Sequence, residues 1–370
     1  MAIKSKTAGR ALPWLRSLMA VLALCGAGSL MGVAHAATGY GAIVINEADG
    51  QVITAVNPDE QNHPASLAKM MTLYLTFQAL EGGKLKLDQE LPVSAWAASK
   101  APTKLDLRNG QTISVEDCIL GMITKSANDA ATVMAEGLGG TEGDFVESMN
   151  AQALRLGMSN THFANASGLP DPNDTTTARD MAKLAMALYH DYPQYSHYFA
   201  TKEFMFRGRL VRGHNNLMDK YPGMDGLKTG FTNASGFNLA STAVRDGQRI
   251  FGVVMGGHTA ATRDRLMARL LDDGFEDHET PAALVAQAAG TPAGASRTKR
   301  VLEALSPIGT AEAETVPETA RRHHRHGKVG TVAATTCTPR KGAKCPTSAK
   351  RSAAKKPLAS ASSRSIPKEP

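Results

Sequence analysis

Long apolar runs are absent from this 370-residue sequence after its N-terminal segment. A helix that crosses a bilayer needs about 20 consecutive apolar residues, and no run after residue 36 approaches that length. A membrane-spanning body is therefore excluded. We expect the mature protein to be soluble outside the cytoplasm.

Cysteine is also scarce, with four residues in the chain. Cys25 lies in the N-terminal apolar run, and Cys337 and Cys345 lie close together near the C-terminus. An oxidising compartment would permit one disulfide there, and whether Cys337 and Cys345 pair stays open. Cys118, in an apolar context, is predicted to be a small core residue rather than a reactive thiol.

Acidic residues are missing from the first 36 positions. The cations there are Lys4, Lys6, Arg10 and Arg16. An apolar run over 18–33 follows, and then Ala34-His35-Ala36. This order is typical of a secretory signal peptide, so residues 1–36 are predicted to direct export across the inner membrane and to be cleaved after Ala36. The alternative is an uncleaved anchor, but the run is short and rich in Gly and Ala. The predicted location is periplasmic, free or peripherally attached to membrane or wall.

The C-terminal part has few aromatic residues and an excess of positive charge. From residue 297 onward, 16 Lys and Arg face 5 Asp and Glu, although the whole chain has a net charge of +7. Such a composition cannot bury a core, so residues 281–370 are predicted to be a basic disordered tail. Two interpretations stay open: electrostatic attachment to anionic wall polymer or lipid headgroups, or a solvated tether. No specific nucleic-acid partner is expected.

Residues 38–280 are predicted to form one α+β domain. Runs rich in β-formers cover 39–46 and 51–57, around an Asp49-Gly50 turn, and three more cover 226–232, 237–244 and 249–256. Tight turns between neighbouring strands require antiparallel pairing. The residues between, roughly 64–200, are largely helical, and another helix is expected over 262–271. The prediction is a five-stranded antiparallel sheet built from both ends of the domain and flanked by helices.

The first candidate motif is Ser66-Leu67-Ala68-Lys69, at the start of an apolar segment over 67–80. The pattern indicates a buried helix with Ser66 in its first turn, and positions three apart share one helix face. Lys69 can activate the Ser66 hydroxyl as a nucleophile only while its amine is neutral. That requires lowering a pKa of ~10.4 by about three units, through burial and a neighbouring cation. The alternative is an N-cap serine and a surface lysine.

The second motif is Ser126-Ala127-Asn128, which follows a predicted helix over 114–124. As functional groups, Ser126 would relay a proton to a leaving amine and Asn128 would hydrogen-bond a substrate amide. The same residues also suit a plain capping turn before a helix over 130–137. The position of the motif between the other two favours function.

The third motif, Lys228-Thr229-Gly230, opens a predicted strand. A strand edge beside the nucleophile can bind an extended peptide, and Gly230 allows close approach. Lys228 and Thr229 would bind a terminal carboxylate, with Arg263 as a possible second cation. The Ser66 N–H and a strand N–H, assigned to Thr232, would form an oxyanion hole. The alternative for Lys228 is an ordinary lysine at a strand end.

The order and context of these motifs carry the argument. The chain also contains decoys, at 296–299, 352–355 and 148–150, which fit the same short patterns. With their surroundings, the three motifs and the stretch Thr177-Ala178-Arg179-Asp180-Met181 resemble the serine D-alanyl-D-alanine carboxypeptidases, the low-molecular-mass penicillin-binding proteins of peptidase family S11. The resemblance covers about residues 38–280.

This resemblance implies a β-lactamase/transpeptidase-like fold with Ser66, Lys69 and Ser126 as catalytic residues and no metal or organic cofactor. It implies removal of the terminal D-alanine from peptidoglycan pentapeptide stems through an acyl-enzyme on Ser66, in cell-wall biogenesis and remodelling, and covalent inhibition by β-lactams. Two features depart from the family: Phe231 follows the K-T-G triad where members often carry His, and no second β-rich domain or amphipathic C-terminal anchor is visible.

Three alternatives stay open. A D,D-endopeptidase could use the same site. A β-lactamase-like hydrolase is disfavoured because no convincing E-x-x-L-N sequence follows Ser126. A non-enzymatic wall-binding protein would have no need of a buried lysine.

Overall fold

The structure is a computed structural model that describes residues 39–290. The predicted signal peptide, the tail beyond residue 290 and three of the four cysteines lie outside this range. None of the helices within it is long and apolar enough to span a bilayer.

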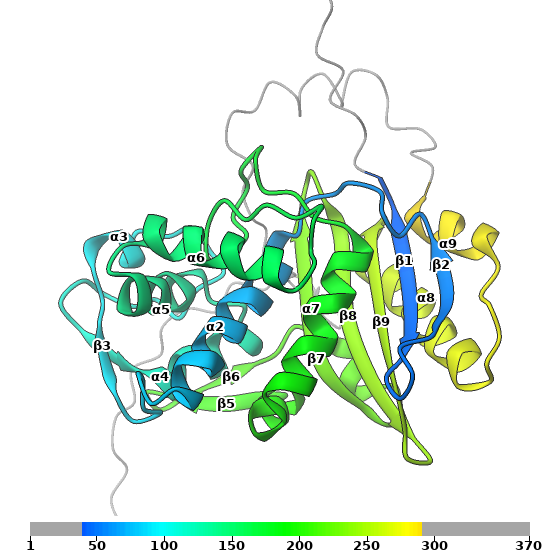
Figure 1. Cartoon of the computed structure of the whole chain (residues 1–370). Helices are drawn as coiled ribbons and strands as arrows, with labels where there is room; N and C mark the ends of the chain where they lie inside the picture. The colour runs from blue at the N-terminus through cyan, green and yellow to red at the C-terminus, as the bar shows by residue number, and fades with distance from the viewer. Residues whose placement is uncertain (1–38, 291–370) are drawn as a thin grey trace, which may run out of the picture. The chain divides into compact units, whose positions relative to one another are not determined.

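A five-stranded antiparallel sheet forms the centre of the described part (Figure 1). Its strand order is β2-β1-β9-β8-β7. The strands are β1 Gly41–Asn46, β2 Val52–Val56, β7 Met224–Thr232, β8 Gly236–Arg245 and β9 Gln248–Gly257. The predicted sheet built from both ends of the domain is therefore confirmed. The strand that carries the K-T-G motif, β7, lies at an edge with one side open.

Helices cover both faces of this sheet (Figure 1). On one face α7 Ala178–Asp191 lies against β1, β8 and β9. The rest of this layer consists of the other helices of the central region: α2 Lys69–Glu81, α3 Ala95–Ala98, α4 Val115–Ile123, α5 Asn128–Gly139 and α6 Glu142–Arg155. The other face packs against α8 Ala260–Phe275 and α9 Ala282–Ala289. Three 3-10 segments complete the set: η1 Ala65–Ala68, η2 Pro193–Ala200 and η3 Asn216–Asp219.

Alternation along the strands divides the core into two layers. Ile43 and Ile45 of β1 belong to the cluster formed with α2 and α7, whereas Ala42 and Val44 belong to the cluster formed with α8. Side chains of successive strand residues point to opposite faces, so a sheet covered on both sides reads as a continuous apolar run. This explains the unbroken Ala42–Ile45 sequence.

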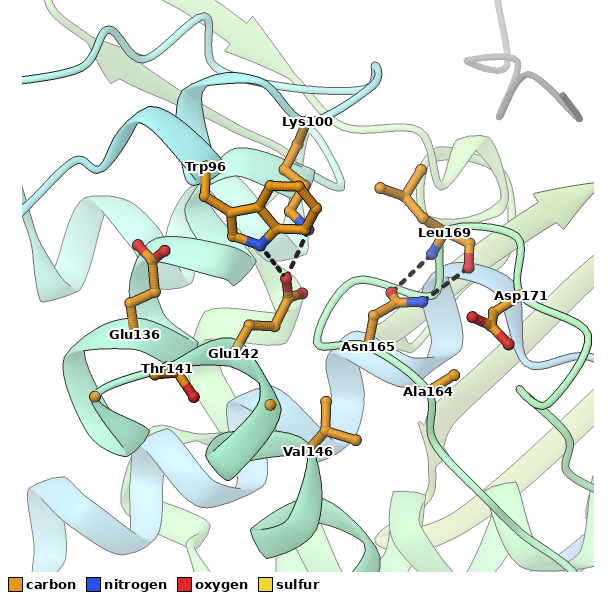
Figure 2. A pocket seen from close by; sticks show the side chains of 12 residues that line it. Trp96, Lys100, Glu136, Thr141, Glu142, Val146, Ala164, Asn165, Leu169 and Asp171 are labelled. Carbon is orange, nitrogen blue, oxygen red and sulfur yellow. Dashed lines mark hydrogen bonds and ion pairs between the residues drawn. The ribbon is translucent and has the colours of Figure 1, made fainter.

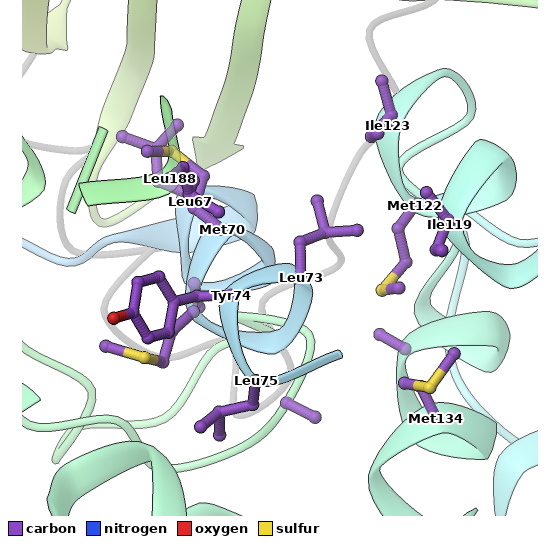
Figure 3. Close-up of a cluster of buried hydrophobic side chains, with 14 of the residues drawn as sticks. Leu67, Met70, Leu73, Tyr74, Leu75, Ile119, Met122, Ile123, Met134 and Leu188 are labelled. Carbon is purple, nitrogen blue, oxygen red and sulfur yellow. The ribbon is translucent and has the colours of Figure 1, made fainter. Parts of the chain in front are cut away.

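Helix α2 runs through the middle of the first layer, as the apolar sequence of residues 67–80 predicts. Every residue from Lys69 to Phe77 is buried. Figure 3 shows Leu67, Met70 and Leu73 among side chains from α4, α5 and α7. The α-helix begins at Lys69, and Ser66 lies in the preceding 3-10 turn rather than in the first turn of the α-helix. In a 3-10 turn, residues three apart eclipse one another, so Ser66 and Lys69 are aligned more directly than expected.

Three small features were not predicted from the sequence. The strands β3 Glu90–Pro92 and β4 Thr112–Ser114 form one short antiparallel pair, and β5 Glu203–Phe206 and β6 Arg209–Arg212 form a hairpin. These strands have three or four residues, too few for a period-two pattern to stand out. Helix α9 lies beyond residue 280, and its Val285 is buried in the cluster around α8.

The loop before α7 passes directly over the start of η1. Gly168 has φ +72°, and a Cβ at this position would overlap the carbonyl of Ala65 and lie 3.1 Å from the Ser66 nitrogen. Ala65 itself has φ +49°, an uncommon conformation for a residue with a side chain. The loop therefore presses on the backbone that carries Ser66.

We predict that Gly168→Ala lowers the free energy of unfolding by at least about 3 kcal/mol, because positive φ and steric overlap both oppose the methyl group. Gly83→Ala is the matched control: Gly83 has φ +67° but open space around its Cβ position. The control should cost only about 1 kcal/mol. Urea unfolding of both variants measures the difference, and equal losses would show that the Gly168 contact is not close.

Candidate active site

The three motifs meet at the junction of η1, the α4–α5 turn and the edge strand β7. Lys69 Nζ lies 3.1 Å from Ser66 Oγ and 2.6 Å from Asn128 Oδ1. The backbone of Gly230 lies against η1, since a Cβ there would be 3.2 Å from the Ser66 nitrogen. Ser66 and Gly230, 164 positions apart in the sequence, are thus in direct contact.

The Lys69 amine is completely buried. Its third hydrogen bond, of 2.6 Å, is to the carbonyl oxygen of Ser167. All three acceptors are neutral oxygens. Burial lowers the pKa of Lys69 well below that of an ordinary lysine, and the nearby positive charge of Lys228 lowers it further, while the charges of Asp129 and Asp174 oppose the shift. The two causes that the sequence analysis required are therefore present.

Ser126 adopts a strained backbone conformation at the turn between α4 and α5. Its φ is +58°, and its side chain is buried, with 6% exposure. Among the residues that the structure describes, its hydroxyl has no hydrogen-bond partner. A left-handed conformation for a non-glycine residue costs energy and is enriched at functional sites. The Ser126 side chain does not cap the following helix. The N-cap of α5 is Ala127, and no side chain makes a capping hydrogen bond there.

Asn128 connects Lys69 to the loop before α4. Its Nδ2 donates to the Ala101 carbonyl at 2.9 Å, and its backbone N–H donates to the Thr103 carbonyl at 2.7 Å. The next residue, Asp129, is fully buried and accepts hydrogen bonds from the backbone of Leu105 and Leu107 at 3.0 Å each. This turn is therefore rigidly attached to the 101–107 loop.

The strand register determines which way the K-T-G side chains point. Cross-strand partners direct their side chains to the same face of a sheet. Lys228 pairs with Ala240, which belongs to the cluster containing α2, whereas Thr229 pairs with Leu239, which belongs to the cluster containing α8. The side chain of Lys228 is thus on the side of Lys69, and that of Thr229 on the side of α8. Lys228 Nζ also donates to the Thr229 carbonyl at 2.8 Å.

Arg263 reaches the sheet from the α8 side. It is buried, with 1% exposure, and its Nη1 donates to the Asn238 carbonyl at 3.0 Å. Asn238 is the partner of Gly230 in the register, so Arg263 lies one strand behind the K-T-G motif. It is also paired with Asp264, at 2.9 Å.

The oxyanion-hole role suggested for Thr232 does not fit its hydrogen bonding. The Thr232 N–H donates to Ser235 Oγ at 2.9 Å, within the turn between β7 and β8. Backbone groups of successive strand residues point to opposite edges. The N–H that faces the open edge of β7 is therefore that of the preceding residue, Phe231.

Two residues of the site, Ser167 and Gly168, were not predicted from the sequence. The Ser167 carbonyl completes the shell of Lys69, and Gly168 presses on Ala65. A backbone carbonyl carries no side-chain signature, and the only available signal was the run of small turn residues Asn165-Ala166-Ser167-Gly168. Within residues 39–290, no group of three or more His, Cys, Asp or Glu side chains is placed to hold a metal ion.

Cys118 is free and fully buried on α4, and burial raises the pKa of its thiol. The prediction of a core residue is confirmed.

The sequence of this chain is similar to the sequences of known cell-wall peptidases. The chain is 34% identical over 245 residues to D-alanyl-D-alanine carboxypeptidase DacD of Escherichia coli, a match that covers 64% of this chain and 63% of DacD. It is also 34% identical over 206 residues to a D-alanyl-D-alanine endopeptidase of Pseudomonas aeruginosa, with 54% and 64% covered. The chain thus spans a little over three fifths of the length of these relatives.

Solved structures show the same fold. Penicillin-binding protein 5 of Haemophilus influenzae superposes with a TM-score of 0.62 at 34% identity, covering 65% of this chain and 71% of that chain. Penicillin-binding protein D2 of Listeria monocytogenes, in its ampicillin-bound form, superposes with a TM-score of 0.56 at 32% identity, covering 64% and 96%. The expected β-lactamase/transpeptidase-like fold is confirmed.

The sequence profile of the D-alanyl-D-alanine carboxypeptidases, peptidase family S11, matches residues 32–259, which is more than half of the chain. With the site geometry and the fold in agreement, this chain belongs to the S11 family of D-alanyl-D-alanine carboxypeptidases.

Proposed function

We propose that this protein is a serine D,D-carboxypeptidase that removes the terminal D-alanine from peptidoglycan pentapeptide stems. The observation that carries the proposal is the buried Lys69 amine, 3.1 Å from Ser66 Oγ, with a pKa lowered by burial and by Lys228. A neutral amine at hydrogen-bond distance can remove the serine proton.

The proposed reaction uses these groups in the following order. Ser66 Oγ transfers its proton to Lys69 Nζ and attacks the carbonyl carbon of the penultimate D-alanine. The developing oxyanion is bound by the backbone N–H groups of Ser66 and Phe231 at the Gly230 contact. The proton passes through the Ser126 hydroxyl to the leaving amine as the peptide bond breaks. Water then attacks the acyl carbonyl and loses a proton to the Lys69 amine. The ester bond to Ser66 breaks, Lys69 returns that proton to Ser66 Oγ, and the shortened stem leaves with a new carboxylate.

The substrate carboxylate is the group that orients the peptide. The hydroxyl of Thr229 and the guanidinium of Arg263, on the α8 side of the strand, would bind it, with the charge of Lys228 contributing from the other side. An extended peptide could then pair with the edge strand β7, and Asn128 would hydrogen-bond a substrate amide. The buried position of Lys228 supports a second role, which is to keep Lys69 neutral.

The proposal also covers inhibition by β-lactams and the location of the protein in the cell. β-Lactams would acylate Ser66, in keeping with the ampicillin-bound relative. Export to the periplasm, and attachment of the basic tail to anionic wall polymer or membrane, depend on residues outside the described range. The endopeptidase relative makes cleavage of cross-links a second candidate activity of the same site.

Ser66→Ala should reduce D-alanine release from diacetyl-Lys-D-Ala-D-Ala by at least about 10³-fold, because the nucleophile is lost. Mass spectrometry should show a persistent benzylpenicilloyl adduct on the unaltered protein and none on the variant. Ser296→Ala, in a decoy S-x-x-K sequence, is the control and should retain both properties. Equal release by Ser66→Ala would refute the catalytic assignment, and rapid penicillin turnover would indicate a β-lactamase.

Acylation by benzylpenicillin should accelerate as pH rises through the lowered pKa of Lys69, since only the neutral amine accepts a proton. Lys228→Met removes a neighbouring positive charge, which raises the pKa of Lys69, so the rate profile should move toward higher pH. Lys86→Ala, on the exposed surface, is the control and should leave the profile unchanged. Stopped-flow acylation rates across pH measure the shift, and an unmoved profile in Lys228→Met would contradict the electrostatic role.

Thr229→Val should lower kcat/KM by about tenfold for peptides with a free C-terminal carboxylate, because a hydrogen bond to a charged group is lost. The matched control is the same peptide as a C-terminal amide, for which the variant and the unaltered protein should differ little. Steady-state D-alanine or D-alaninamide release measures both. An equal loss on the two peptides would remove the carboxylate role of Thr229.

A further inference from the structure

Glu142, the first residue of α6, is a nearly buried carboxylate that joins two separate segments of the chain (Figure 2). Its Oε2 accepts hydrogen bonds from Trp96 Nε1 at 2.7 Å and from Lys100 Nζ at 2.6 Å. Its Oε1 accepts one from the Ala166 backbone N–H at 3.2 Å. The carboxylate therefore fastens the segment around Lys100 to the loop around Ala166. It has no part in the reaction proposed above.

The segment that follows Lys100 holds the second motif in place. The carbonyl of Ala101 accepts a hydrogen bond from Asn128 Nδ2 at 2.9 Å, and the carbonyl of Thr103 accepts one from the Asn128 backbone N–H at 2.7 Å. Thr103 Oγ1 also donates to the Ser126 carbonyl at 3.0 Å. This segment thus fixes the position of the Asn128 amide, whose oxygen accepts a hydrogen bond from the buried amine.

The loop around Ala166 holds the first motif. Thr72 Oγ1 donates to the Ala166 carbonyl at 2.7 Å, which ties the loop to α2. The carbonyl of the next residue, Ser167, accepts the 2.6 Å hydrogen bond from Lys69. Gly168 lies against the backbone that precedes the nucleophile. The position of this loop therefore sets the position of both reacting side chains.

Two of the three hydrogen-bond acceptors of Lys69 are thus connected to the same carboxylate. Asn128 is bonded to the residue that follows Lys100, which is one partner of Glu142. Ser167 directly follows the backbone N–H that is another partner. The two acceptors come from different segments, so their separation depends on the link between those segments.

The link is strong because its charges are withdrawn from water. The side chains of Lys100 and Glu142 are 8% and 10% exposed. Lys100 Nζ also lies 3.9 Å from the centre of the Trp96 ring, and the N-terminus of α6 favours the negative charge. Removing one member of a buried ion pair leaves the other charge uncompensated, which opens the contact or draws in water.

We propose that Glu142 is a positioning residue for the acylation of Ser66. It holds two segments at the separation at which each supplies an oxygen to the Lys69 amine. Its own hydrogen bonds go to other groups, so it acts through these segments and not on the reacting atoms. The inference rests on the proposed carboxypeptidase function, because acylation is the step that it governs.

Loosening the segments and removing a charge have opposite effects on the amine. Loosened segments admit water, which weakens the desolvation that lowers the pKa of Lys69, so this pKa rises. Loss of a negative charge alone would lower the pKa of Lys69 further. The direction in which a pH profile moves therefore separates the two roles.

The other charged groups near Lys69 and Glu142 stay unaltered in this comparison. The charges that act on the amine are those of Lys228, Asp129 and Asp174. Two further carboxylates line the same cavity as Glu142 (Figure 2), those of Glu136 and Asp171.

The test uses Glu142→Gln in the mature full-length protein. Glutamine has the same shape but no charge, and it leaves the Lys100 ammonium unpaired. The rate constant of acylation by benzylpenicillin should fall about 10-fold to 100-fold, as expected for a misplacement of about 1 Å, and the rate profile should move toward higher pH. Glu147→Gln, at an exposed position of α6, is the matched control and should retain rate and profile. Stopped-flow acylation across pH measures both.

A second variant separates positioning from folding. Lys100→Met/Glu142→Leu removes both charges, and replacing a buried ion pair by apolar residues of similar volume is often neutral for stability. Urea unfolding should show that the double variant regains most of the stability that Glu142→Gln loses. Acylation should stay slow, because the Ala166 N–H has lost its acceptor.

The outcomes separate the positioning role from the function. Recovery of the acylation rate in the double variant would overturn the proposal and reduce Glu142 to a counter-ion of Lys100. An unchanged rate in Glu142→Gln, or a profile that moves toward lower pH, would also overturn it. Absence of D-alanine release and of penicillin acylation in the unaltered protein would refute the carboxypeptidase function itself.

Discussion

The burial of one amine is the constraint on which this site depends. Lys69 has no exposed surface, and its three hydrogen-bond partners are neutral oxygens. A buried ammonium without a directly bonded carboxylate is costly, so the low dielectric favours the neutral form. Lys228 adds repulsion from the neighbouring strand. The fold thereby lowers the pKa of this amine at the same place where it aligns the amine with a hydroxyl.

This arrangement requires strain, and the strain is supported by packing on all sides. Ala65 and Ser126, the residues at the two hydroxyl-bearing turns, both have positive φ. Such conformations persist only where the surroundings determine them. Gly168 and Gly230 press on the Ser66 backbone from two other elements, and Asp129 fastens the second turn to its neighbouring loop. A Cβ at Gly168 would overlap the Ala65 carbonyl, and one at Gly230 would crowd the Ser66 nitrogen at 3.2 Å.

Positive charge gathers where the K-T-G strand meets α8. Lys228 lies on β7, and Arg263 of α8 donates to the Asn238 carbonyl of the adjoining strand β8. A peptide with a terminal carboxylate would be oriented by these charges before it reacts. Orientation matters for the proposed acyl transfer, because the carbonyl of the penultimate residue has to reach Ser66.

The sequence by itself determined the local chemistry and the sheet. Strand alternation, tight turns and the apolar character of α2 are local properties, and they placed all five strands within two residues of their ends. The pairing of Ser66 with Lys69 is also local, since it needs only one helical turn. Whether each motif acts catalytically stays a prediction, but their meeting at one point was correctly anticipated from their order.

Only the tertiary structure decided the contacts between distant segments. One such contact is the hydrogen bond from Lys69 to the Ser167 carbonyl, and another is the close approach of Gly168 to Ala65. A third is the Glu142 carboxylate, which accepts hydrogen bonds from Trp96, Lys100 and Ala166. These contacts involve backbone groups or residues that no sequence motif marks. The same is true of the strand N–H at the open edge, which belongs to Phe231 and not to Thr232, because a hydrogen bond to Ser235 fixes the direction of the turn. Backbone groups are the same at every position, so their roles depend on where the chain places them.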